Sequence, residues 1–147
     1  MRTLLKLLAG PVAACAACGD GGGPALVEIE AQPVTREAVR AGSLSSVESG
    51  GRAIRVRQII RVPDACRTLA ADLLRTGNDL TLRVHAAPDG QACPRSEAYL
   101  AYDAQIRQVP AGRYSLRVVH ASGSHREGSR VVLEHPVVVL ERSVDVR

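Results

Sequence analysis

Residues 106–118 read IRQVPAGRYSLRV, which has the form of a β-strand, a tight turn and a second β-strand. Pro110 fits the second position of the turn, where its ring presets φ, and Gly112 fits the fourth. From Tyr114 to Val118, apolar residues alternate with polar ones, the period of two that is typical of a strand with one buried face. The stretch therefore predicts two consecutive strands that meet at a Pro-Gly turn.

The same alternation recurs along most of the chain. Further predicted strands cover residues 54–62, 80–84, 100–106, 131–133 and 137–140. Turn signals lie at 76–79, 88–90 and 122–124, and Pro136 indicates an edge strand or a bulge. Residues 68–75 fit a hairpin strand better than a helical turn, whereas residues 37–48 are compatible with a helix or a strand. Short strands with regular turns and no βαβ pattern predict one antiparallel β-sandwich domain over residues 26–147.

The strand, Pro-Gly turn, tyrosine and strand of residues 106–118 resemble a pattern of fibronectin type III and prealbumin-like sandwich domains. This resemblance implies an immunoglobulin-like or prealbumin-like β-sandwich. It also implies that Tyr114 forms a tyrosine corner, with its hydroxyl hydrogen-bonded to backbone across the loop. The resemblance covers a small part of the chain, so it bears on the fold and not on activity.

Cys66 and Cys93 lie just before and just after the predicted hairpin at residues 68–84. A hairpin brings its two ends together, which is the geometry that a disulfide needs. We therefore predict a Cys66–Cys93 disulfide. A redox or metal-binding role for the pair is the alternative, but the Cys-x-x-Cys spacing typical of such sites is missing.

The N-terminus has the pattern of an export signal over residues 1–17. Arg2 and Lys6 precede an uncharged run, Leu7–Ala17, that is too short for a permanent membrane-spanning helix but suits a signal-peptide h-region. We predict a signal helix here, followed by a Gly-rich tether over residues 18–25. The mature chain would then have a formal net charge of +2 instead of +4.

The end of this run, Val12-Ala13-Ala14-Cys15-Ala16-Ala17-Cys18, resembles the lipobox of bacterial lipoproteins. That resemblance implies a diacylglycerol on a cysteine thiol and a chain anchored by lipid on the extracytoplasmic side of a membrane. We favour Cys18, because lipidation there removes Cys15 with the signal and leaves only the paired Cys66 and Cys93. Lipidation of Cys15 and a plain secretory signal, giving a secreted or periplasmic protein, are the alternatives.

Two clusters of polar residues are candidate binding sites. His120, His125 and His135 would approach one another if residues 113–121 paired with 129–136, and together they could hold Zn²⁺ or Cu²⁺. Arg55, Arg57 and Arg61 line one face of a predicted strand and could bind a polyanion such as lipid phosphate. Solvated loop histidines and a solvated strand face are the alternatives, and we favour them because no metal-site spacing is present and neighbouring acids offset the arginines.

The chain's 147 residues include three Tyr but no Phe or Trp, and its charge is not concentrated in one segment. This composition argues against a nucleic-acid-binding protein, which concentrates basic residues and interleaves aromatic ones. No serine-hydrolase elbow or catalytic carboxylate cluster is evident, so we expect no enzyme and no cofactor. We expect a cell-envelope lipoprotein with a non-catalytic binding or structural domain that contacts an envelope protein, or alternatively a histidine-based metal-binding protein or metalloenzyme.

Overall fold

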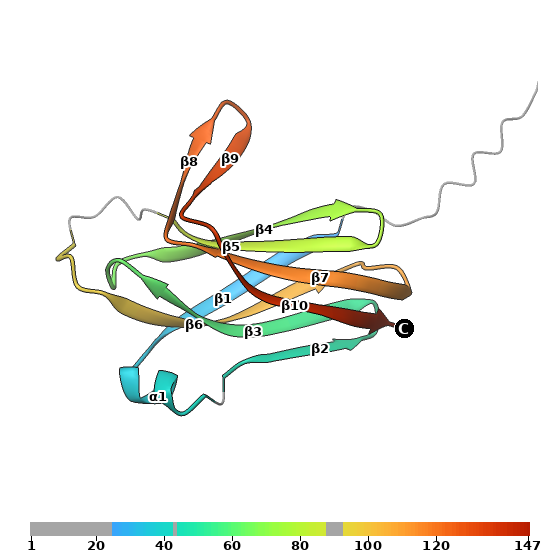
Figure 1. The fold of residues 1–147 in the computed structure, drawn as a ribbon, viewed down its shortest axis with the longest axis horizontal. Helices are drawn as coiled ribbons and strands as arrows, with labels where there is room; N and C mark the ends of the chain where they lie inside the picture. Colours follow the sequence, from blue (N-terminus) through green and yellow to red (C-terminus); the bar gives the residue numbers. More distant parts are fainter. Residues whose placement is uncertain (1–24, 43, 88–92) are drawn as a thin grey trace, which may run out of the picture.

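The computed structural model describes residues 25–42, 44–87 and 93–147, which form a β-sandwich (Figure 1). The predicted signal helix at 1–17, most of the tether at 18–25 and the turn at 88–90 lie outside the described residues. The elements in chain order are β1 Leu26–Val34, α1 Arg36–Arg40, β2 Ser46–Gly50, β3 Ala53–Val62, β4 Thr68–Thr76, β5 Asp79–Ala87, β6 Ala98–Arg107, β7 Gly112–Ala121, β8 Gly123–Glu127, β9 Arg130–Glu134 and β10 Val137–Val146.

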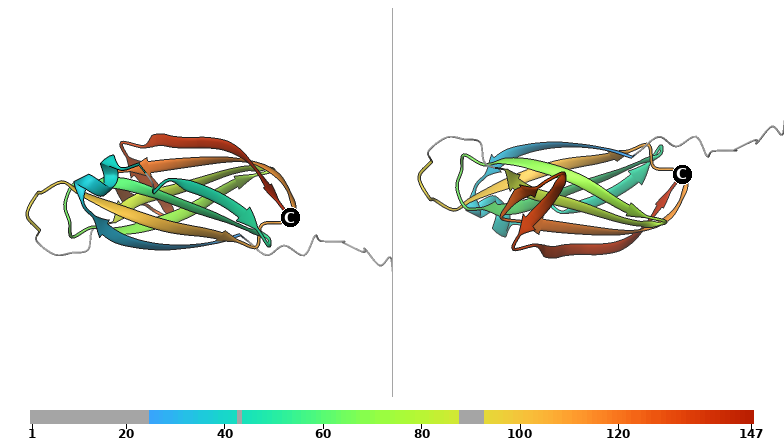
Figure 2. Two further views of the ribbon diagram at one scale, coloured as in Figure 1. Left: turned by 90° about the horizontal axis from the view of Figure 1, so that it is seen from below. Right: turned by 90° about the horizontal axis from the view of Figure 1, so that it is seen from above.

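Two four-stranded sheets make the sandwich, and Figure 2 shows them stacked as two layers. Sheet A has the strand order β1-β6-β3-β2, and sheet B has the order β10-β7-β5-β4. The hairpin β8–β9 projects from the sandwich as a separate two-stranded sheet. The prediction of an all-β sandwich is confirmed.

One strand pair departs from the predicted antiparallel arrangement. β5 and β7 are parallel, with Leu82 opposite Val118. The reason is topological, because β6 lies between them in the sequence but crosses to sheet A. The chain therefore returns to sheet B in its original direction.

The core forms where the inward faces of the two sheets meet, and the alternation read from the sequence identifies these faces correctly. Most core side chains are aliphatic. The largest fully buried ones are Ile54, Ile60, Leu80, Leu82, Ile106, Leu116, Val56, Val62, Val84, Val109 and Val118. Without Phe or Trp, β-branched and leucine side chains supply the interlocking surface between the sheets.

The turn that closes β6 onto β7 has the predicted tyrosine corner. The Tyr114 hydroxyl donates a hydrogen bond to the Pro110 carbonyl oxygen at 2.9 Å, and Tyr114 itself is buried. The predicted hairpin of residues 68–84 is also confirmed, because Thr76 pairs with Asp79 across a turn in which Gly77 has φ 60°. Glycine suits that position because it carries no Cβ to clash at positive φ.

The segment that the sequence left open, residues 37–48, holds parts of two elements. α1 is a single helical turn capped by the Thr35 hydroxyl, which accepts a hydrogen bond from the Ala38 amide at 3.3 Å. β2 follows and pairs with β3. The segment therefore contributes both a helix and a strand.

Pro136 directly precedes β10, which is an edge strand with a register shift between Val138 and Leu140. The predicted edge and bulge are therefore both present. The predicted turn at residues 122–124 is wrong, however, because Gly123 begins β8 and the chain reverses later, at Gly128 with φ 62°.

Candidate functional site

The predicted disulfide is present, since the Sγ atoms of Cys66 and Cys93 are bonded and their Cα atoms lie 6.0 Å apart. Beside it, Asp64 is only 7% exposed and accepts hydrogen bonds from the Cys66 amide at 3.2 Å and from Arg67 Nε at 2.9 Å. Asp64, Cys66 and Cys93 are the one group of three potential metal-ligating residues that come together among the described residues. Because both cysteine sulfurs are bonded in the disulfide, this group of residues is a covalent cross-link and not a metal site.

The arginines considered as a polyanion site are held by carboxylates of the chain itself. Arg55 Nε lies 2.8 Å from both carboxylate oxygens of Asp103, and Arg55 Nη2 contacts the same group. Arg57 Nε donates to Asp103 from the same strand at 3.2 Å. The hydrogen bond from Arg55 lowers the pKa of Asp103 below its usual value, and the bond from Arg57 acts in the same direction.

The remaining arginine contacts follow the same pattern. Arg57 also lies 3.7 Å from Glu48, and Arg61 Nε lies 3.1 Å from Glu97. Each guanidinium of the predicted stripe thus has an acidic neighbour within the chain. The geometry favours the alternative of a solvated strand face over a polyanion site, because a ligand phosphate would have to displace these carboxylates.

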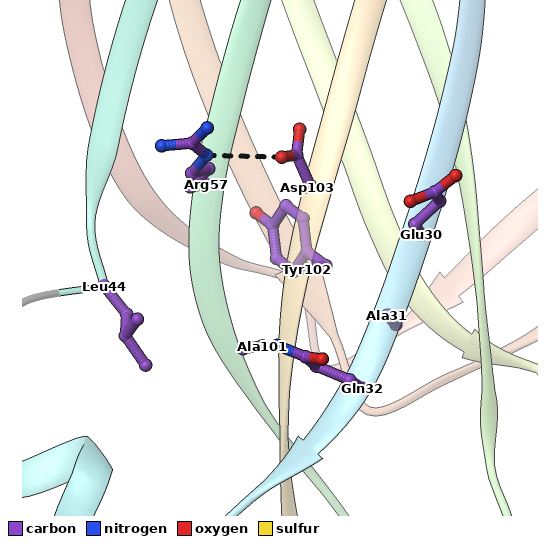
Figure 3. A pocket seen from close by; sticks show the side chains of 8 residues that line it. All are labelled: Glu30, Ala31, Gln32, Leu44, Arg57, Ala101, Tyr102 and Asp103. Atoms are coloured by element: carbon purple, nitrogen blue, oxygen red, sulfur yellow. Dashed lines mark hydrogen bonds and ion pairs between the residues drawn. The ribbon is translucent and has the colours of Figure 1, made fainter.

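A recess of about 330 Å³ lies on the face of sheet A where these charges are located (Figure 3). Its lining residues come from β1, β6, β3 and the segment before β2, and they are Glu30, Ala31, Gln32, Leu44, Arg57, Ala101, Tyr102 and Asp103. We take this recess as a candidate binding site because it combines charged and apolar side chains.

The strand register explains the chemistry of this recess. Glu30 on β1 stands opposite Asp103 on β6, and Asp103 stands opposite Arg57 on β3. A row of acid, acid and base therefore crosses three strands, and Leu44 and Ala101 add apolar surface beside it (Figure 3). Such a surface suits a partner that offers both apolar and hydrogen-bonding groups. Sequence reasoning identified Arg57 but not Asp103, whose outward position in the β6 alternation was the available signal.

The three histidines predicted to approach one another do not form a metal cluster among the described residues. The pairing of residues 113–121 with 129–136, which was the condition for the histidines to approach one another, does not occur, because β7 pairs with β5 and β10 whereas β9 pairs with β8. The strand that carries His120 and the strand that ends just before His135 are therefore not neighbours.

His120 points into the sandwich interior instead. Its Nε2 lies 2.8 Å from the hydroxyl oxygen of Tyr102 on the opposite sheet, and the two rings meet edge to face with centroids 5.5 Å apart. Burial lowers the pKa of His120 to about 4 and raises the pKa of Tyr102. His120 is therefore neutral at physiological pH, and the tautomer with its ring proton on Nδ1 would accept a hydrogen bond from the Tyr102 hydroxyl at Nε2.

The other two predicted ligands are at the base and side of the β8–β9 hairpin. His125 is exposed and lies 3.5 Å from Glu134 and 3.4 Å from Glu127, whereas His135 Nδ1 lies 3.4 Å from the Ser122 hydroxyl. These contacts are those of solvated hairpin residues, and they favour the alternative of loop histidines over a shared metal.

His85 was not predicted as a site residue, but it is 6% exposed and its Nδ1 atom has no hydrogen-bond partner. Its Nε2 atom lies 3.9 Å from Asp72, which also accepts a hydrogen bond from Arg83 Nε at 2.5 Å. Burial is the main cause of a lowered pKa for His85, although Asp72 acts in the opposite direction. This histidine is consequently a second neutral imidazole at physiological pH.

The lipidation candidates Cys15 and Cys18 lie outside the described residues. Within residues 25–42, 44–87 and 93–147, no helix is long and apolar enough to cross a membrane. Comparison of the chain with protein-family models, with curated protein sequences and with solved structures gives no match.

Proposed function

We propose that the chain is an exported protein of a bacterial cell envelope, anchored by lipid at Cys18, whose β-sandwich acts by non-catalytic binding. The observation that carries this proposal is the Cys66–Cys93 disulfide. Disulfides form and persist in oxidising extracytoplasmic compartments and are rare in the cytosol. The disulfide therefore agrees with the signal-like residues 1–17 and with the lipobox-like sequence that ends at Cys18.

The recess on sheet A is the surface that we assign to binding. It combines the exposed carboxylate of Glu30, the Arg57–Asp103 ion pair and the apolar side chain of Leu44. Arg55 binds Asp103 from beside the recess, so the two acids Glu30 and Asp103 are balanced by Arg55 and Arg57. An apolar and hydrogen-bonding segment of an envelope protein therefore fits the recess better than a highly charged ligand does.

Metabolic labelling with radioactive palmitate tests the anchor. We expect label on the wild-type protein and on Cys15→Ser, and no label on Cys18→Ser. Label on Cys18→Ser that disappears from the double variant would move the anchor to Cys15. Label that persists in the double variant, or its absence from the wild type, would contradict lipidation at this sequence.

Photocrosslinking in intact cells tests the recess. A photoreactive residue at Gln32, inside the recess, should give a discrete crosslinked product, and the added substitution Leu44→Ser should weaken that product. The matched control carries the photoreactive residue at Ser115, an exposed position on β7 of the other sheet. Equal products from both positions, or a product insensitive to Leu44→Ser, would contradict binding at the recess.

A further inference from the structure

Three turns and the end of β10 lie at the end of the sandwich where β1 begins (Figure 1). The turns are those between β2 and β3, between β4 and β5, and between β6 and β7. The Arg52 amide donates to the Arg147 carbonyl at 3.2 Å, and the Val109 amide donates to the Arg52 carbonyl at 3.0 Å. The Ser115 amide binds the Asn78 carbonyl at 3.0 Å, which adds the β4–β5 turn to this group. We call this region the tether end, because the predicted tether joins the sandwich here at Leu26.

Exposed arginines surround the tether end. They are Arg52, Arg75, Arg107, Arg113 and Arg147. The acidic side chains at this end of the described strands and turns are fewer, namely Glu28, Glu48, Asp79 and Asp145. The tether end therefore has an excess of positive charge.

These arginines are available to an external anion. Arg107 pairs with Glu28 at 2.9 Å and Arg113 pairs with Asp145 at 3.0 Å, but all four side chains are at least half exposed and such pairs are weak in water. For the other three arginines, no carboxylate partner lies within ion-pair distance in the described part of the chain. Among these, Arg75 is held at this end because its guanidinium lies 5.6 Å from the centre of the Tyr114 ring.

Charge alone does not distinguish the tether end. The opposite end of the sandwich carries as many arginines among its described residues, namely Arg36, Arg40, Arg61, Arg67 and Arg95. The distinction comes from how far the chain can reach. The eight Cα–Cα steps from Cys18 to Leu26, the first residue of β1, span at most about 29 Å when fully extended. The nine Cα–Cα steps of β6 alone cover about 30 Å, and the opposite end also includes α1 and the segments before β4 and β6.

A lipid on Cys18 would therefore keep the tether end near the bilayer. It would prevent the sandwich from standing on the membrane with its opposite end against the lipid. An anionic membrane surface attracts arginines within about one Debye length, roughly 8 Å at physiological salt. Guanidinium groups also pair with phosphate through two parallel hydrogen bonds.

We propose that the tether end rests on the anionic phospholipid headgroups of the membrane that holds the anchor, with Arg52, Arg75 and Arg147 as the principal contacts. This inference rests on the proposed lipid anchor and adds an orientation to it. The recess on sheet A is lined by residues from the middle of β1, β3 and β6 (Figure 3), so in this orientation it would face the surrounding compartment.

The test supplies the anchor chemically, so that its outcome does not depend on lipidation in cells. The predicted mature chain, Cys18–Arg147, contains every residue that the structure describes, and its Cys18 thiol can be coupled to a maleimide lipid while Cys66 and Cys93 stay in their disulfide. Because the chain has no Trp, a single introduced tryptophan is a unique fluorescent probe. Ala111→Trp places it in an exposed turn at the tether end, and Ala65→Trp places it in an exposed turn at the opposite end.

The vesicles contain a headgroup-level nitroxide quencher and either phosphatidylcholine alone or phosphatidylcholine with about one third phosphatidylglycerol. We expect at least twofold stronger quenching of Ala111→Trp on the phosphatidylglycerol vesicles, reversed by 0.5 M salt, and no such difference for Ala65→Trp. Adding Arg52→Gln, Arg75→Gln and Arg147→Gln should abolish the difference. The matched set Arg36→Gln, Arg40→Gln and Arg95→Gln, which removes the same charge from the opposite end, should leave it unchanged.

Two results would overturn the orientation. One is equal quenching of Ala111→Trp on both kinds of vesicle, which would show that the tether alone sets its distance from the lipid. The other is an equal effect of the two arginine sets, which would show that only net charge matters. The salt series uses unaltered arginines, so it decides the question even if the substituted chains fold poorly. Failure of palmitate labelling in cells would instead contradict the proposed anchor and would leave this measurement unaffected.

Discussion

The hydroxyl of Tyr102 on β6 and Nε2 of His120 on β7 lie 2.8 Å apart, forming a side-chain hydrogen bond that links sheet A to sheet B inside the sandwich. Tyr102 is only 3% exposed, so its hydroxyl has little access to water. Each group therefore depends on the other, because an unpaired buried donor or acceptor costs free energy.

We expect the free energy of unfolding to decrease as the pH falls from 6.5 towards 4. Burial lowers the pKa of His120 from 6.5 to about 4, so in this range the unfolded chain binds a proton that the folded chain does not. The stabilisation that comes from the lowered pKa of His120 is fully present above pH 6.5 and is lost as the pH falls to about 4. The total loss of unfolding free energy is about 3 kcal/mol. His85, whose pKa is also lowered, acts in the same direction.

Urea unfolding at pH 7.0, 5.5 and 4.5 measures this dependence. His120→Gln should reduce the slope, since glutamine offers a hydrogen-bond acceptor without titrating. The exposed His125→Gln should leave the slope as in the wild type. Equal slopes for wild type and His120→Gln would show that His120 titrates normally in the folded protein.

Tyr102→Phe should lower the free energy of unfolding by about 1–3 kcal/mol, because it leaves His120 Nε2 without its partner in the core. Tyr99→Phe is the matched control. The Tyr99 hydroxyl binds Glu97 at 3.1 Å at the surface, so its removal should cost far less. Equal losses from the two substitutions, measured by urea unfolding at pH 7, would contradict the assigned role of the buried pair.

Tyr114→Phe should lower the free energy of unfolding by about 1 kcal/mol. The substitution keeps the buried ring but removes the 2.9 Å hydrogen bond to the Pro110 carbonyl. Amide hydrogen exchange provides a local measurement, since the Pro110 turn should exchange faster while the β4–β5 turn stays unchanged. Unchanged exchange at both turns would mean that packing alone holds the corner.

Breaking the disulfide with Cys66→Ser and Cys93→Ser should lower the free energy of unfolding by about 3.5 kcal/mol in the chain-entropy model, given the sequence separation of 27 residues. Reduction of the wild-type protein should produce a similar loss, whereas the double serine variant should not respond to a reductant. A response of that variant would show that the reductant acts elsewhere.

Gly77→Ala should lower the free energy of unfolding by about 1–2 kcal/mol, because Gly77 has φ 60° and an alanine Cβ is strained there. Gly50→Ala is the control, since Gly50 has no positive φ and a Cβ there would meet no atom within 4 Å. Thermal unfolding of the two variants compares them directly. A loss as large for Gly50→Ala would show that backbone strain is not the cause.

Much of the fold could be predicted because alternation is a local signal. Ile54, Leu82 and Leu116 are buried as their spacing predicts. The alternation alone is enough to identify a strand with one buried face. Strand pairing depends instead on contacts between distant segments. The parallel β5–β7 pair follows from β6 crossing to the other sheet, which no local pattern specifies.

The candidate site was less predictable for related reasons. His120 continues the inward alternation of Leu116 and Val118, so the available pattern placed it in the core, but the nearby serines and glycine indicated a loop end. Gly123 looked like a turn residue, although the chain passes through it in extended form as β8. The ion pairs of Arg55 and Arg57 with Asp103 join β3 to β6. They depend on a strand register that the sequence alone does not specify.

The position of β1 has a consequence for the order of folding. Among the described residues, β1 is the first strand, yet its one neighbour in the sheet is β6, which follows after four other strands. Pairings this distant in sequence slow folding, since a large loop must close before they form. In the export that we propose, β1 would leave a translocation pore before its partner strand β6 and would stay unpaired until β6 had followed.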